Sequence, residues 1–210
     1  MKSLYSFIVK PYDDRYDNVR QVDGNNLIIN TSIENHRFVS KKAVVVSTPA
    51  AYNTKINIGD ELYIHHNVFR RWYDQKGKER NSSTFFKDNL YFVSPGQIYM
   101  YNLKPHLDYC FIKPLKNQNI LENRKEQPNV GIVKYTNSSL EAVGITPGTL
   151  ITFTPNSEFE FIIEGERLYC MKSNDIALTH EYQGNEKENN LKLIVTGKRN
   201  KCPRCDSYSF

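Results

Sequence analysis

A chain of 210 residues, of which 39% are hydrophobic and 12% aromatic, is long and apolar enough for one large or two small folded domains. A mean hydropathy of −0.60, without any apolar run of about 18 residues, excludes a membrane-spanning helix. The net charge of +5 arises in residues 1–104, which carry 15 Lys and Arg against 10 Asp and Glu. This modest excess favours solvated surface over a dedicated acidic partner.

The start of the chain predicts a cytoplasmic protein, and this location bears on the interpretation of its cysteines. Residues 1–7 lead directly into a strand-like pattern, without the apolar segment and cleavage site of a secretory signal. In a cytoplasmic chain, four cysteines argue against a disulfide framework. They are Cys110, Cys170, Cys202 and Cys205.

Residues 1–104 have the pattern of a small all-β unit. Apolar residues alternate or cluster between Gly, Pro and Asn turns in five places, which predicts five strands. These strands are expected at residues 4–11, 43–46, 61–66, 90–93 and 97–101. Two polar segments interrupt them, a long loop at 12–42 and a basic insertion at 67–89. Short strands with turns at regular spacing are typical of a small barrel.

The loop at 12–42 contains one run of large aliphatic residues, Leu27, Ile28 and Ile29. Long loops without secondary structure are uncommon in compact domains, and those that occur are usually functional or disordered. The triplet is therefore either a short buried strand or an anchor that becomes ordered when it binds a groove in another protein. The loop by itself leaves both alternatives open.

The second half of the chain repeats the first. Four segments recur in the same order, at offsets of 103, 88, 89 and 78 residues. The recurring pairs are 7–11 with 110–114, 43–45 with 131–133, 59–67 with 148–156, and 90–98 with 168–176. The falling offsets mean that the first copy has longer loops after its first strand and after His66. We predict two tandem β-barrels, at residues 1–104 and 105–181, followed by a basic tail at 182–210.

Each copy has the order strand, loop, strand, short connection, strand, hairpin and final strand, and this order resembles the GroES-type co-chaperonins. The resemblance covers about residues 3–180 and is found twice. Its most specific pieces are residues 7–11, 27–29, 58–64 and 94–98 in the first copy and 173–176 in the second. The insertion at 67–89 looks like that of the divergent forms encoded by bacteriophages.

The resemblance implies a ring-shaped homo-oligomer that caps a GroEL-type chaperonin ring and assists the folding of an enclosed substrate, such as a viral capsid protein. In that family the aliphatic triplet of a mobile loop docks into a hydrophobic groove of the chaperonin, so the partner-binding residues would be Leu27, Ile28 and Ile29. The shorter second loop offers only Ile120 and Leu121, where we expect at most a weak contact. ATP would be bound by the chaperonin, and a viral form would work in the cytoplasm of a bacterial host.

The tail carries a C-x-x-C pair, Cys202 and Cys205, which is half of a tetrahedral zinc site. The other thiols, Cys110 and Cys170, fall in predicted strands and are expected to be core residues. The alternative that this pair leaves open is a zinc site whose remaining ligands come from His180 or from a neighbouring protomer. We favour a solvated tail and expect no metal and no other cofactor.

Two further groups admit a functional interpretation. His65 and His66 end a predicted strand, so their side chains are expected to point to opposite faces and not to share a metal. The insertion combines Arg70, Arg71 and Trp72 with lysines, a mixture suited to nucleic acid, although an exposed basic hairpin or a subunit contact is favoured.

The chain contains none of the common phosphate-binding or nucleophile motifs, G-x-x-x-x-G-K-[ST], G-x-G-x-x-G or G-x-S-x-G. We therefore expect no enzymatic activity and no catalytic residue. The alternative to a co-chaperonin is a nucleic-acid-binding or virion-assembly β protein without chaperonin activity.

Overall fold

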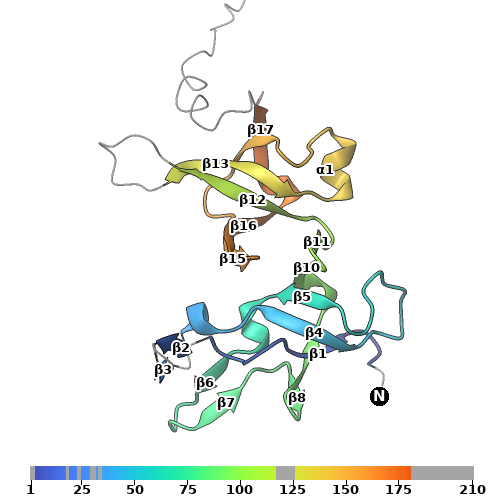
Figure 1. The fold of residues 1–210 in the computed structure, drawn as a ribbon. Helices are drawn as coiled ribbons and strands as arrows, with labels where there is room; N and C mark the ends of the chain where they lie inside the picture. The colour runs from blue at the N-terminus through green and yellow to red at the C-terminus, as the bar shows by residue number, and fades with distance from the viewer. Residues whose placement is uncertain are drawn as a thin grey trace, which may run out of the picture.

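Two β-rich units lie one above the other in the computed structural model of the protein (Figure 1). The structure describes residues 3–17, 19–22, 25–28, 32, 35–116 and 126–180. Strands dominate these residues, and the only α-helix among them is the short α1 (Ser138–Ala142). The all-β prediction is thus confirmed for the described part of the chain. No helix in that part has the length and apolar character needed to cross a membrane.

The sheet of the lower unit contains seven strands: β1 (Phe7–Pro11), β4 (Lys42–Ser47), β5 (Glu61–Ile64), β8 (Phe85–Lys87), β9 (Leu90–Val93), β10 (Ile98–Tyr101) and β11 (Lys104–Pro105). Their order is β11-β10-β5-β4-β1-β9-β8, and all neighbours are antiparallel. Two separate hairpins accompany this sheet: β2 (Val19–Val22) with β3 (Asn25–Ile28), and β6 (Arg71–Tyr73) with β7 (Glu79–Asn81). Three 3₁₀ helices lie in its connections: η1 (His36–Phe38), η2 (His66–Val68) and η3 (Pro95–Gln97).

The sheet of the upper unit contains six strands: β12 (Tyr109–Lys116), β13 (Glu126–Tyr135), β14 (Leu150–Phe153), β15 (Phe159–Ile163), β16 (Glu166–Lys172) and β17 (Ile176–His180). Their order is β15-β16-β12-β13-β14-β17, again with antiparallel neighbours. Helix α1 lies between β13 and β14, and the 3₁₀ helix η4 (Ser173–Asp175) precedes β17.

The two sheets share one strand order, because β8-β9-β1-β4-β5-β10 corresponds one to one with β15-β16-β12-β13-β14-β17. The register corresponds as well. Val9 pairs with Val45 and Tyr91 in the lower sheet, and Ile112 pairs with Val133 and Tyr169 in the upper sheet. These equivalences reproduce three of the offsets read from the sequence, which are 103, 88 and 78 residues.

The fourth offset, 89 residues, appears at the glycine turn that leads into β5 and β14. Gly59 and Gly148 have φ angles of +92° and +94°, a region that L side chains rarely adopt. The Gly59 amide donates to the Val45 carbonyl at 2.9 Å, and the Gly148 amide donates to the Val133 carbonyl at 2.8 Å. The repeat therefore extends from strand order to individual turn hydrogen bonds.

Neither sheet closes into a barrel in the described residues, so the expected closed barrels are not observed. In the lower unit the two terminal strands of the sheet each pair with their neighbour in the chain. Strand β8 folds back on β9 through Asp88 and Asn89, and β11 folds back on β10 through Asn102 and Leu103. All four turn residues have positive φ, as two-residue hairpins require. The sheet therefore ends at β8 and β11, and these two strands are not paired with each other among the described residues.

A shared hydrophobic cluster joins the two units. Tyr63 and Tyr99 of the lower sheet pack with Phe111 and Phe161 of the upper sheet, and all four side chains are buried. The rings of Tyr99 and Phe161 meet edge to face with centroids 5.2 Å apart, a favourable aromatic geometry. Separate clusters fill the inside of each unit. The unit boundary near residue 104 thus lies next to a common core.

Candidate partner-binding site

Two residues of the aliphatic triplet, Leu27 and Ile28, lie in β3, at the end of the β2–β3 hairpin away from its turn. Ile28 pairs with Val19 and Leu27 pairs with Arg20 in antiparallel register. Leu27 is 57% exposed and Ile28 is 61% exposed, whereas Ile29 lies outside the described residues. Adjacent residues of a strand point to opposite faces, so exposure of both means that neither face of the hairpin end is covered at this point. Leu27 and Ile28 lie in a strand, but their side chains are not buried.

The root of the loop is folded by backbone pairing, although the sequence predicted a structureless loop over 12–42. Tyr16 and Val39 form an antiparallel bridge, and both side chains are buried in the core of the lower unit. The amide of Asp17 donates to the carbonyl of Phe38 at 2.8 Å, and the amide of Ser40 donates to the carbonyl of Arg15 at 3.0 Å. The hairpin with Leu27 and Ile28 therefore extends from a fixed base.

Arg15 joins this base to the insertion at 67–89. Its Nη1 donates to Oδ1 of Asn81 at 2.7 Å, and its Nη2 donates to the carbonyl of Arg70 at 3.2 Å. The guanidinium carbon lies 5.2 Å from the centre of the Tyr91 ring, within cation–π range. Desolvation by burial lowers the pKa of Arg15, and the neighbouring tyrosines act in the opposite direction. The side chain thus spans three parts of the lower unit.

Tyr16 makes the second link between the loop root and the insertion. Its hydroxyl accepts a hydrogen bond from the amide of Arg71 at 2.8 Å, and the Arg71 guanidinium lies 4.6 Å from the centre of the Tyr16 ring. Arg71 also forms an ion pair with Glu79 across the β6–β7 hairpin at 2.9 Å. The insertion is consequently a folded hairpin attached to the root of the loop.

The histidines near the loop root are arranged differently from the sequence expectation. His66 begins the 3₁₀ helix η2, and His65 is its N-cap, so the two rings stack with centroids 4.4 Å apart instead of pointing to opposite faces. The ring of His36 lies 5.4 Å from that of His66. Desolvation, the neighbouring histidines and nearby cations lower the pKa of His66 to about 4. His66 is therefore neutral near pH 7.

No group of three or more His, Cys, Asp or Glu residues in the described part of the chain could hold a metal ion. Cys110 and Cys170 are free and buried, as expected for core residues, and burial raises the pKa of Cys110 to about 12. His180, the residue considered as a zinc ligand, has its Nε2 atom 2.7 Å from Oγ1 of Thr152.

Two predicted sites fall outside the part of the chain that the structure describes. The C-x-x-C pair, Cys202 and Cys205, belongs to the tail after residue 180. The second-loop pair, Ile120 and Leu121, belongs to the segment 117–125. The predictions for these four residues stay predictions.

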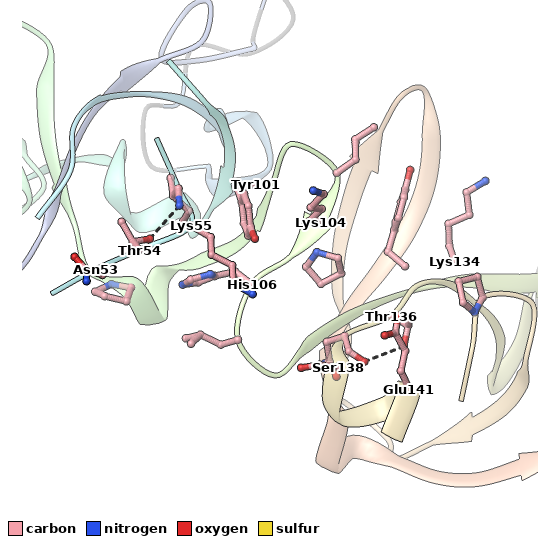
Figure 2. A pocket seen from close by; sticks show the side chains of 18 of the residues that line it. Asn53, Thr54, Lys55, Tyr101, Lys104, His106, Lys134, Thr136, Ser138 and Glu141 are labelled. Carbon is pink, nitrogen blue, oxygen red and sulfur yellow. Dashed lines mark hydrogen bonds between the residues drawn. The ribbon is translucent and has the colours of Figure 1, made fainter. Parts of the chain in front are cut away.

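A cleft of about 670 Å³ lies between the two units (Figure 2). Lys55 and Lys104 of the lower unit and Lys134 of the upper unit line it, together with His106. The Nε2 atom of His106 is enclosed without a hydrogen-bond partner, and Lys134 forms an ion pair with Glu166 at 3.1 Å. The lining also includes the carboxylate of Glu141 and tyrosine and proline side chains.

The sequence missed the residues that hold the loop root, which are Arg15, Tyr16 and Val39. A usable signal was present, because Tyr16 and the Phe38-Val39 pair are apolar residues that stand near the two ends of the polar loop. Their pairing across more than about 20 intervening residues could not be read from local pattern. Arg15 gave no signal, since its partners lie in the insertion.

The fold and the site define a β protein of two repeated units that presents an exposed aliphatic hairpin. No protein-family model matches this chain, and no curated protein matches its sequence. The resemblance to the GroES-type co-chaperonins therefore stays a prediction.

Proposed function

We propose that this protein is a co-chaperonin that caps an ATP-driven chaperonin ring and assists protein folding, with a viral capsid protein as one candidate substrate. The observation that carries the proposal is the exposure of Leu27 and Ile28 on a hairpin with a fixed base. Aliphatic side chains in this position can enter a hydrophobic groove of a partner without disturbing the core that supports them. Ile29 would complete the contact.

A single hairpin of this kind would bind weakly. Burying three aliphatic side chains provides roughly 5–9 kcal/mol at about 1.5–3 kcal/mol each, before the cost of association is subtracted. Several identical hairpins on one symmetric assembly raise the effective concentration of each, so the assembly binds well while each contact remains releasable. This behaviour suits a lid that must leave the chaperonin in every cycle.

The repeat supports a ring-shaped homo-oligomer, because one edge is covered in the lower sheet and, in the described part of the chain, open in the upper sheet. Strand β10 pairs with β5 on one side and with β11 on the other. Its counterpart β17 pairs only with β14 among the described residues. A neighbouring protomer that covers β17, as β11 covers β10, would form a head-to-tail contact. Such contacts generate rings when the rotation closes.

We expect native mass measurement at micromolar concentration to show a closed oligomer that Leu178→Asp disrupts. By the offset of 78 residues Leu178 corresponds to Met100, which is fully buried at the junction of the units, yet Leu178 is 59% exposed. A charge there would oppose burial against a second protomer. Val143→Asp, at an exposed position that follows α1, serves as the control. A wild-type protein that is only monomeric would contradict the ring.

The direct test of the function uses the full chain and a purified GroEL-type chaperonin. With ATP present we expect capture of this protein by the chaperonin, a change in the chaperonin's ATPase rate and faster refolding of a denatured substrate. Omission of ATP should abolish capture, because a lid on an ATP-driven ring must distinguish its nucleotide states. Absence of capture under both conditions would refute the proposed function.

A further inference from the structure

The β6–β7 hairpin of the insertion is an exposed aromatic and basic surface beside the loop. Its aromatic residues, Trp72 and Tyr73, are both exposed. The hairpin extends from the same end of the lower unit as β2–β3 (Figure 1), and Arg15 and Tyr16 tie the two together at their bases. Any partner that engages Leu27 and Ile28 therefore approaches this hairpin as well.

The charges of the hairpin are only partly neutralised. Arg71 pairs with Glu79 and Arg80 pairs with Asp74, each at 2.9 Å. Among the described residues no carboxylate forms an ion pair with the remaining cations of the hairpin and its flank, which are Arg70, Lys76 and Lys78. The uncompensated charge on this surface is thus positive, which complements an acidic partner surface.

A shallow groove of about 470 Å³ lies next to Trp72. It is lined by Asn67, Arg70, Trp72, Ser82 and Ser83. The Nε atom of Arg70 is enclosed without a hydrogen-bond partner. An indole and a guanidinium in one groove can receive a partner side chain that is apolar along its stem and acidic at its tip.

We propose that the β6–β7 hairpin is a second docking element for the chaperonin. The hairpin would bind an acidic and partly apolar surface of the chaperonin, next to the groove that receives the aliphatic hairpin. This inference rests on the proposed function. The hairpin is already folded by strand pairing and ion pairs, so its contact adds binding with little ordering cost. It would strengthen a loop contact that is weak by itself.

Nucleic acid is the competing partner for an aromatic and basic surface. The insertion at 67–89 carries six Lys and Arg against three Asp and Glu, a net charge of +3 that is low for binding a phosphate backbone. Two of its arginines are committed to ion pairs. The β6–β7 hairpin is attached to the same loop root as the aliphatic hairpin, which we propose binds a protein. A protein partner is therefore favoured for the β6–β7 hairpin as well.

The test uses fluorescence, because Trp72 is the only tryptophan in the chain. With the full-length protein, a tryptophan-free GroEL-type chaperonin and ATP, we expect a blue shift of Trp72 emission on binding. Trp72→Ala should weaken binding by about 10-fold, in the range of interface aromatic residues. Phe159→Ala removes an exposed aromatic residue of the upper unit and should leave binding unchanged.

The outcomes separate the two proposals. If Ile28→Asp loses binding while Trp72→Ala binds as the wild type, and wild-type emission does not shift, the second docking element is refuted and the proposed function stands. If the wild-type protein does not bind the chaperonin, both proposals fail. If a single-stranded oligonucleotide shifts Trp72 emission in a salt-dependent manner and the chaperonin does not, the β6–β7 hairpin binds nucleic acid and the inference is overturned.

Discussion

Ile28→Asp is expected to abolish ATP-dependent capture by a chaperonin while leaving the fold unchanged. Ile28 is 61% exposed, so the aspartate would remain solvated in the free protein and the core would not be disturbed. In the complex the same carboxylate would enter an apolar groove without a partner charge, which is strongly unfavourable. Every hairpin of an oligomer would carry the change, so the loss multiplies across the assembly.

Capture on immobilised chaperonin with ATP measures the effect, and a thermal melt of the free variant measures its stability. Ile58→Asp is the matched control, because Ile58 is also an isoleucine of the lower unit and is 68% exposed. We expect Ile58→Asp to bind as the wild type. Unaltered capture of Ile28→Asp would show that the aliphatic hairpin is not the docking element.

Phe161→Ala is expected to destabilise the protein by about 3–5 kcal/mol, the usual range for a buried phenylalanine. The side chain is buried where the two units meet. Its ring contacts those of Tyr63, Tyr99 and Phe111, with centroids 6.3, 5.2 and 5.8 Å away. The cavity left by the substitution would be lined by aromatic residues of both sheets, which cannot easily collapse into it.

Lys41 extends this junction to the loop root. Its ammonium lies 4.8 Å from the centre of the Phe161 ring and donates to the carbonyl of Glu160 at 2.6 Å. Desolvation by burial lowers the pKa of Lys41, and Glu160 acts in the opposite direction. Loss of the Phe161 ring would remove a cation–π contact of Lys41 and would expose this partly buried ammonium to solvent.

Denaturant unfolding measures the free-energy change for Phe161→Ala. Ile162→Ala is the control, because Ile162 is the next residue of the same strand and its side chain is exposed. Its substitution should change the free energy of unfolding by no more than about 1 kcal/mol, the span of strand propensities. Equal effects of the two substitutions would mean that the two units do not share a core in solution.

The strands and their repetition could be predicted from the sequence because local periodicity and turn residues carry that information. The pairs Val9 with Val45 and Ile112 with Val133 follow the offsets that the sequence shows. The aliphatic residues Leu27 and Ile28 were also identified from the sequence, since three large aliphatics inside a polar segment stand out by composition alone.

Tertiary structure decided what depends on contacts between distant residues. Only the folded chain brings Tyr16 to Val39 and Arg15 to Asn81, and these contacts hold the loop root beside the insertion. Only the folded chain places Phe161 against the lower unit. Short apolar strings specify a strand and its buried face, but they do not specify which surface covers that face, because hydrophobic contact is not directional.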